Sequence, residues 1–260
     1  MDLGLQDRAA VVTGASRGIG RQIAVALADE GCRVLLCARD AGALAATAAD
    51  LGGAGVPFPV DLTDPDAAGT IVAECQRAFG RLDIVVNNAG SAVPKPLAEL
   101  TAGDWQAGLE VNFLAAARLS VAAAPVMRAA GWGRLVHVAS ISGREPDPVF
   151  APYSAAKAAL LNLSTALSRA FAADGVLSSC VVPGVTVTEL VEANALATAE
   201  RTGRAPADVM ERMLAKQGVA AGRFGRPDEV AAAVVFLASE AAAWITGATV
   251  EVDGGTLRSV

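Results

Sequence analysis

The sequence predicts an α/β fold of the Rossmann type, a doubly wound parallel sheet of about seven strands with helices on both faces. Three observations support this prediction. Short apolar runs alternate with helical stretches from one end of the chain to the other. The apolar runs are continuous in Val, Ile and Leu, which is typical of strands covered on both faces. A glycine-rich turn follows the first run, at the phosphate-binding position of this fold.

The expected strands lie at AAVVTG, RVLLCA, VPFPVD, DIVVNNAG, RLVHVAS, LSSCVVPG and ATVEVDGG. The expected helices between them cover residues 18–30, 40–51, 64–79, 102–130 and 227–238, together with the stretch APYSAAKAALLNLSTALSRAF. Strand followed by helix, repeated, indicates parallel strands joined by right-handed crossovers. Residues 184–222 interrupt this rhythm, because they are far longer than a usual strand-to-helix connection. We therefore expect one domain over 1–260, with 184–222 as a substrate lid within it.

Composition narrows the class of protein. The 53% hydrophobic content with only 4% aromatic residues indicates a core built from Ala, Val and Leu. A net charge of −6 and the lack of a Lys/Arg cluster argue against nucleic-acid binding. The apolar runs are too short to cross a bilayer, and the start MDLGLQDR has no secretory pattern, so we expect no membrane association and a cytoplasmic location.

The cysteines and the histidine predict no metal site. Cys32, Cys37, Cys75 and Cys180 lack metal-ligand spacing, and the single His137 cannot complete a site with them. His137 is expected to be a hydrogen-bonded structural residue in a strand.

The turn after the first strand reads Thr13-Gly14-Ala15-Ser16-Arg17-Gly18-Ile19-Gly20, and a helix follows at once. Glycines let the backbone approach a pyrophosphate, and a helix N-terminus offers free N–H groups and a partial positive charge. The second strand ends in Cys37-Ala38-Arg39, without the acid that would bind an unphosphorylated ribose. Arg17 and Arg39 are therefore expected to bind a 2′-phosphate, which favours NADP(H) over NAD(H). A solvated loop arginine is the alternative interpretation of Arg39.

Tyr153 and Lys157 stand four residues apart on an expected helix, so both side chains leave the same face. A nearby ammonium favours the phenolate, and we expect Lys157 to lower the pKa of Tyr153 from its usual value of ~10. Such a phenol exchanges a proton with a carbonyl oxygen. A surface pair on an Ala-rich helix would show the same spacing.

These motifs resemble the short-chain dehydrogenase/reductase family, in its compact single-domain branch, over essentially the whole chain. The resemblance rests on the TGASRGIG loop, Asp61, the turn Asn87-Asn88-Ala89-Gly90, Asn112, Ser140, Tyr153, Lys157 and the stretch Pro183–Thr188. It implies catalytic roles for Asn112, Ser140, Tyr153 and Lys157. Ser142 competes with Ser140, but the family spacing of thirteen residues before the tyrosine selects Ser140. The cofactor contacts that follow are Gly14, Ser16, Arg17, Gly18, Ile19, Gly20, Arg39, Asp61, Leu62, Asn88, Ala89, Gly90, Tyr153, Lys157, Pro183, Gly184, Val185 and Thr188.

The substrate is less clearly encoded. Candidate contacts are Ala92, Val93, Glu145, Val149 and Phe150, with Val185, Leu190, Val191, Leu196, Met210, Met213 and Leu214 from the lid. These apolar lid residues would equally serve to dock the lid helices. The C-terminal region is similar to that of 3-oxoacyl-acyl-carrier-protein reductases. Where such enzymes carry basic residues that dock the acidic carrier protein, this chain has Gly131 and Asp174, although Arg128 and Arg134 lie nearby.

The expected activity is NADPH-dependent reduction of a ketone carbonyl, in a 3-oxoacyl thioester or another apolar ketone, to a secondary alcohol. Alternatives are a dehydrogenase for alcohols or hydroxysteroids working in the oxidative direction, a sugar epimerase or dehydratase, and a noncatalytic dinucleotide sensor. The resemblance also implies a homotetramer, in which Ala156, Ala159 and Ala166 would permit close helix approach across a two-fold axis. The three alanines could equally pack within the subunit.

Overall fold

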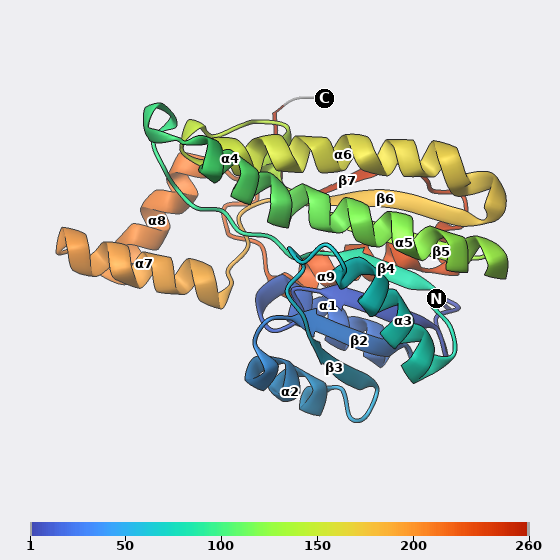
Figure 1. The fold of residues 1–260 in the computed structure, drawn as a ribbon. Coiled ribbons are helices and arrows are strands. Elements are labelled where there is room, and N and C mark those ends of the chain that lie inside the picture. Colours follow the sequence, from blue (N-terminus) through green and yellow to red (C-terminus); the bar gives the residue numbers. More distant parts are fainter. Residues whose placement is uncertain (1, 259–260) are drawn as a thin grey trace.

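The computed structural model describes residues 2–258, apart from the side chain of Leu190. Its centre is a parallel sheet of seven strands (Figure 1). The spatial order is β3-β2-β1-β4-β5-β6-β7, which reverses direction between β1 and β4. The strands are β1 (Ala9–Thr13), β2 (Arg33–Ala38), β3 (Gly55–Pro59), β4 (Ile84–Asn87), β5 (Gly133–Val138), β6 (Val176–Pro183) and β7 (Thr249–Val252). The doubly wound fold expected from the sequence is confirmed.

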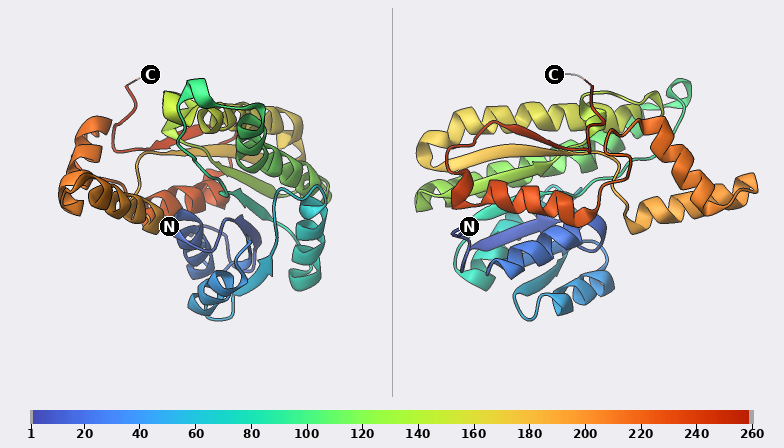
Figure 2. Two further views of the ribbon diagram at one scale, coloured as in Figure 1. Left: turned by 60° about the vertical axis from the view of Figure 1, so that its left-hand side comes forward. Right: turned by 180° about the vertical axis from the view of Figure 1, so that it is seen from behind.

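Helices cover both faces of this sheet (Figure 2). The α-helices are α1 (Gly18–Asp29), α2 (Ala41–Asp50), α3 (Ala67–Phe79), α4 (Ala102–Leu109), α5 (Ala115–Ala130), α6 (Ala151–Phe171), α7 (Glu189–Thr202), α8 (Pro206–Gln217) and α9 (Pro227–Ala238). Helices α1 and α9 pack against each other on one face, and α3, α5 and α6 cover the other.

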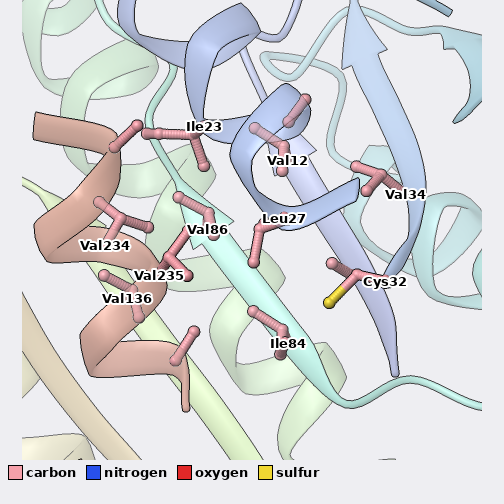
Figure 3. Close-up of a cluster of buried hydrophobic side chains, with 14 of the residues drawn as sticks. Val12, Ile23, Leu27, Cys32, Val34, Ile84, Val86, Val136, Val234 and Val235 are labelled. Atoms are coloured by element: carbon pink, nitrogen blue, oxygen red, sulfur yellow. The ribbon is translucent and has the colours of Figure 1, made fainter. Parts of the chain in front are cut away.

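Two apolar clusters fill the layers on either side of the sheet. Ala10 and Val12 of β1 belong to the cluster under α1 and α9, whereas Ala9 and Val11 belong to the other. Figure 3 shows the first cluster, in which Leu27 of α1 lies among valines and an isoleucine from the strands and α9. Every residue of β1 is buried, which explains why the strand carries apolar side chains on both faces from Ala9 to Val12.

The helix expected over 102–130 contains an interruption. A π-helical turn, Glu110–Leu114, separates α4 from α5 and contains the buried Asn112. By length and composition alone, Ala102–Ala130 would be long and apolar enough to cross a membrane. In this fold it packs against α3 and α6, and Arg118 forms an ion pair with Glu110 on its surface.

Residues 184–222 form a helical hairpin of α7 and α8 that projects from one end of the molecule (Figure 1). The two helices pack on each other through Ala195, Ala199 and Val209, with Met210 and Met213 beside them. A short parallel bridge between Thr186 and Gly225 joins the two ends of the hairpin. The hairpin therefore has a small apolar core of its own.

Candidate active site

A cleft of about 910 Å³ opens beside the carboxyl ends of β1 and β4, where the strand order reverses. In open α/β sheets this is the position at which ligands bind. Fourteen of the predicted cofactor contacts line the cleft, namely Gly14, Ser16, Arg17, Gly18, Ile19, Gly20, Arg39, Asp61, Leu62, Asn88, Ala89, Gly90, Tyr153 and Thr188. The sequence motifs thus converge on one place.

The glycine turn requires its glycines for two reasons. Gly14 and Gly18 have φ angles of +67° and +55°, a region that side chains disfavour. A Cβ at Gly20 would lie 2.2 Å from the Gly14 carbonyl oxygen, so only glycine fits there. No side chain caps the N-terminus of α1, whose first residue is Gly18. Its N–H groups are therefore free to bind an anion.

Thr13 ties the glycine turn to the end of β4. Its hydroxyl oxygen accepts hydrogen bonds from the backbone N–H groups of Asn88 at 3.0 Å and Ala89 at 3.1 Å. In return, the side-chain amide Nδ2 of Asn88 donates a hydrogen bond to the Thr13 backbone carbonyl at 2.9 Å. Thr13 belongs to the predicted glycine loop but was not among the predicted site residues. A hydroxyl residue at the last position of a strand is the signal that could have indicated it.

The end of the cleft near β2 carries unpaired positive charge. Arg17 and Arg39 are both exposed, and neither forms a salt bridge within residues 2–258. The pKa of Asp61 is lowered, first by hydrogen bonds from Thr63 and also by the charge of Arg39. Both cations are thus available to an anionic group bound here.

Tyr153 and Ser140 form the hydroxyl pair of the site. The Ser140 side chain caps a short 3-10 helix, Ile141–Gly143, by accepting from the Ser142 N–H at 3.1 Å, and it also faces the Tyr153 phenol. Burial raises the pKa of Tyr153, and the hydrogen bond with Ser140 only partly offsets this. Of the two serines, Ser140 is the one that acts on the phenol by lowering its pKa.

Lys157 lies buried beneath the phenol. Its Nζ donates to the Val138 carbonyl at 2.7 Å and lies 5.6 Å from the centre of the Tyr153 ring. Burial lowers the pKa of Lys157 to about 8. The expected lowering of the Tyr153 pKa by Lys157 is wrong for this arrangement, because burial is the largest effect on the phenol.

Asn112 sits in the π-helical turn with its side chain fully bonded. Its Oδ1 accepts from the Ser91 N–H at 2.9 Å, and its Nδ2 donates to the carbonyls of Ser91 and Gly108, each at 2.9 Å. A Cβ at Gly90 would lie 2.6 Å from this Oδ1 and 3.5 Å from the Lys157 Nζ. Asn112 and Lys157 therefore flank the same glycine. Single-turn π-helices are frequent at functional sites.

The other predicted catalytic and cofactor-binding residues are not part of the described lining of the cleft, namely Asn112, Ser140, Lys157, Pro183, Gly184 and Val185. Pro183, Gly184 and Val185 lie at the end of β6, where the Gly184 N–H donates to the Val252 carbonyl at 3.1 Å. Among the substrate candidates, Val93 lines the cleft and is 70% exposed, whereas Met210 and Met213 pack inside the α7/α8 hairpin. The side chain of Leu190 lies outside the described residues.

His137 and the cysteines have structural surroundings. His137 is fully buried between Asn87 and Ser178, at 3.2 and 3.3 Å, and burial lowers its pKa to about 3. It is thus a neutral, hydrogen-bonded residue, as expected. All four cysteines are free and buried. In residues 2–258, no group of His, Cys, Asp and Glu side chains is arranged to hold a metal ion.

Comparison with known proteins decides the family. Residues 8–198 match the family model described as short chain dehydrogenase. The chain belongs to the short-chain dehydrogenase family. Within that family it is 38% identical to the cis-4-hydroxycyclohexanecarboxylate dehydrogenase of Sinomonas cyclohexanicum, over 96% of each chain. It is also 36% identical to the 3-oxoacyl-acyl-carrier-protein reductase of Escherichia coli, over 97% of this chain and 98% of the relative.

The fold agrees with that of a solved family member. The crystal structure of L-sorbose reductase from Gluconobacter frateurii, complexed with NADPH and L-sorbose, superposes with a TM-score of 0.96. The two sequences are 32% identical, and the match covers both chains fully. This short-chain dehydrogenase fold therefore extends over the whole chain.

A Thr13→Val substitution is expected to weaken the cleft. Valine matches threonine in shape but leaves the N–H groups of Asn88 and Ala89 without an acceptor, at a cost of about 1–3 kcal/mol each. Urea unfolding should show lower stability, and fluorescence titration should show weaker nicotinamide cofactor binding. Thr13→Ser keeps the hydroxyl and is the matched control. Equal behaviour of the two variants would contradict the role given to this hydroxyl.

Lys157 is expected to make stability depend on alkaline pH. Its pKa is depressed in the folded state, so between about pH 8 and its ordinary value of 10.5 the unfolded chain binds more protons. Stability due to this group therefore rises with pH across that window, by on the order of 1 kcal/mol per unit. The test is the difference between wild type and Lys157→Met in urea unfolding from pH 8 to pH 10, below the ordinary pKa of tyrosine, because the four buried cysteines, whose pKa values are raised, titrate in both proteins. In Lys157→Met the increment should disappear, and an unchanged pH dependence would refute the assignment.

Proposed function

We propose that this short-chain dehydrogenase is an NADPH-dependent reductase that transfers a hydride to a ketone carbonyl and gives a secondary alcohol. The observation that carries the proposal is the hydroxyl pair of Tyr153 and Ser140 with the buried Lys157 beneath it. Tyr153 lines the same cleft as the glycine turn. A proton donor and an anion-binding turn in one cleft suit reduction by a phosphorylated hydride donor.

The residues present fit a dinucleotide cofactor. The uncapped N-terminus of α1 provides N–H groups for a pyrophosphate, and Asp61 lies where adenine contacts are expected from the family. When bound, the nicotinamide supplies the hydride. Everything else in the reaction must come from the protein and the substrate.

The side chains would share the proton chemistry. Negative charge develops on the carbonyl oxygen as it is reduced, and Tyr153 can neutralise it by donating its phenolic proton. Because burial raises the pKa of Tyr153, the phenol stays protonated and ready to donate near neutral pH. Ser140 supplies a second hydrogen bond to the same oxygen. Lys157, with a pKa of about 8, can return a proton to the phenol, and Asn112 holds the backbone around Ser91 at the side of Lys157.

The same groups would serve the reverse reaction. A phenolate that accepts the alcohol proton supports oxidation, so a dehydrogenase for alcohols or hydroxysteroids remains the second candidate function. The relative from Sinomonas cyclohexanicum is named as a dehydrogenase, which favours keeping this candidate. A noncatalytic sensor would not need Asn112, Ser140, Tyr153 and Lys157 together.

Two observations support NADPH as the preferred cofactor. Arg17 and Arg39 are exposed cations at the end of the cleft next to β2, and Ala38 stands where an acid would bind an unphosphorylated ribose. The similar L-sorbose reductase is described in complex with NADPH.

The surface near α5 and α6 favours a free ketone over one carried by an acidic protein. Arg128 pairs with Asp174 at 2.6 Å, so its charge is neutralised. Arg134 is 3% exposed and stacks on Trp132, with 4.2 Å between the guanidinium carbon and the ring centre. Neither arginine offers a free positive charge to a carrier protein. We therefore propose that the substrate is a small free ketone rather than a thioester bound to a carrier protein.

The projecting hairpin fits the role of a lid. The N-terminal residues of α7, Thr188 and Glu189, line the cleft, so a rotation at that point would bring α7 and α8 over it. We propose that residues 184–222 cover the substrate as part of a single domain, 1–260. Because Met210 and Met213 pack within the hairpin, they are assigned to its own core rather than to the substrate.

The assembly and the cellular location stay predictions. Of the three alanines expected to permit close helix approach, Ala156 is fully buried within the subunit, whereas Ala166 is exposed. Ala156 therefore packs within the subunit, which is the alternative that the sequence left open. A homotetramer in the cytoplasm remains our prediction for the whole protein.

Tyr153→Phe is expected to abolish ketone reduction while leaving cofactor binding intact. Loss of a positioned general acid lowers kcat by about 10²–10⁴-fold. Steady-state NADPH oxidation with a panel of ketones, together with NADPH titration, measures both effects. Ser140→Ala should also be slow, and Ser142→Ala, the neighbouring hydroxyl, should be near wild type. The proposal fails if Tyr153→Phe reduces ketones at the wild-type rate.

Arg39→Ala is expected to lower the preference for NADPH over NADH. Removing one charge-assisted hydrogen bond to a 2′-phosphate costs about 1.5–3 kcal/mol, roughly 10–100-fold in the ratio of the two kcat/KM values. Arg21→Ala is the matched control, since Arg21 is exposed and pairs with Asp50 at 2.6 Å outside the cleft. If the ratio for Arg39→Ala equals that of the control, the cofactor assignment is wrong.

A further inference from the structure

One ion pair stands at the opposite end of the cleft from the two arginines. The described lining of the cleft contains three cationic side chains, Arg17, Arg39 and Lys95. Arg17 and Arg39 lie at the cofactor end, whereas Lys95 follows β4 and pairs with Asp104 of α4 at 2.7 Å. Both partners are about one-third exposed, at 32% and 31%, so the pair is open to the cleft.

The position of the pair relative to Tyr153 follows from two contacts. The backbone N–H of Lys95 donates a hydrogen bond to the Val149 carbonyl at 2.9 Å, which fixes the Lys95 backbone against the loop that leads into α6. A Cβ at Gly108 would lie 2.7 Å from the Cβ of Pro152, so α4 meets α6 directly beside Tyr153. Asp104 is one helical turn before Gly108 and on the same face of α4. Asp104 therefore lies about one helical turn from the place where α4 meets α6, and Lys95, Asp104 and Tyr153 line the same cleft.

Asp104 is held rigidly by one of its two oxygens. Its Oδ2 accepts from the Thr101 N–H at 2.7 Å, from the Thr101 hydroxyl at 2.6 Å and from Lys95. Among the described residues, Oδ1 accepts no hydrogen bond. Lys95 uses one of its three N–H groups on Asp104. The pair thus presents a fixed free acceptor next to free donors.

The surroundings of the pair are apolar. Leu100, Ala107, Val111 and Pro152 line the same cleft as the pair and Tyr153. A mainly apolar pocket with a few convergent polar groups is the usual form of a small-molecule site, in which the polar groups set the orientation of the ligand. Such a pocket suits a ketone with an apolar middle and one polar group remote from the carbonyl.

We propose that Lys95 and Asp104 bind a hydroxyl group of the substrate remote from its carbonyl, which makes the substrate class small hydroxyketones. The inference rests on the proposed reductase function and names the substrate class of that same site. The hydroxyl oxygen of the substrate accepts a hydrogen bond from the Lys95 ammonium, and the same hydroxyl donates a hydrogen bond to Oδ1 of Asp104. Both groups act as specificity-determining residues and take no part in hydride transfer.

A substrate carboxylate fits this pair less well. It would share Lys95 with Asp104, and the two carboxylates would repel each other at close range. The ordinary partner of an intact ion pair is a group that both donates and accepts, which a hydroxyl does and a carboxylate does not. The geometry therefore favours a hydroxyl.

Three sets of ketones test the inference with the full-length protein and NADPH. They are cyclohexanone, the hydroxycyclohexanone isomers together with open-chain hydroxyketones, and the cyclohexanones that carry a carboxylate. We expect at least one hydroxyketone to exceed cyclohexanone in kcat/KM by roughly tenfold or more, as for a hydrogen bond to a charged group. In Lys95→Met this advantage should disappear through KM, with kcat and the cyclohexanone rate nearly unchanged.

Two further variants separate recognition from structural support. Lys95→Arg keeps a charged donor and should retain part of the hydroxyl preference. Asp104→Asn removes the repelling charge and should improve the carboxylate ketones relative to the hydroxyketones. Thermal unfolding of each variant checks that the fold is intact.

Three results would overturn the hydroxyl site: equal losses for all ketones in Lys95→Met, a carboxylate ketone as the Lys95-dependent substrate of the wild type, or no hydroxyl preference despite cyclohexanone reduction. The absence of turnover with every ketone would contradict the proposed function itself, which keeps the two failures distinguishable.

Discussion

The hydrogen bond from the Lys157 ammonium to the Val138 carbonyl at 2.7 Å is the contact on which the candidate site depends. It fastens α6 to the last residue of β5, and thereby places Tyr153 beside Ser140, two residues beyond Val138. The bond is buried, so its loss would leave an unpaired cation in a low-dielectric interior. The helix that carries the phenol is thus held against the end of the strand that leads to the serine. Neither hydroxyl would be positioned by its own element alone.

Burial also sets the chemistry of the two titratable groups. It raises the pKa of Tyr153 and lowers that of Lys157 to about 8, so the ordinary order is reversed and the ammonium is now the stronger acid of the two. The phenol keeps its proton until it donates it. The ammonium releases a proton more readily and can then re-protonate the phenol. The rest of the cleft divides by charge and polarity, with Arg17 and Arg39 at one end and the Lys95–Asp104 pair at the other. The two ends of one cleft therefore offer different chemistry, two cations that are unpaired among the described residues at one end and an ion pair at the other.

Local sequence signals predicted much of this arrangement, because the features concerned are periodic or adjacent in the chain. The seven strands, the glycine turn and the shared helix face of Tyr153 and Lys157 all follow from spacing. The direction of the Tyr153 pKa did not, since it depends on how deeply α6 is buried against the sheet. Likewise, Asn112 was expected within a continuous helix, and only the packing of 102–130 reveals its π-helical turn. The capping box of Thr101 and Asp104 is readable in the sequence, but its pairing with Lys95 forms across a loop.

A crystal structure of the protein with NADP⁺ bound is the most direct test of the central claim that one cleft holds the cofactor phosphate at one end and the reacting carbonyl beside Tyr153. The account predicts the 2′-phosphate between Arg17 and Arg39, the pyrophosphate at the N-terminus of α1, and the nicotinamide ring next to the Tyr153 phenol above Lys157. A cofactor bound in the opposite direction, or a nicotinamide ring out of reach of the phenol, would contradict it.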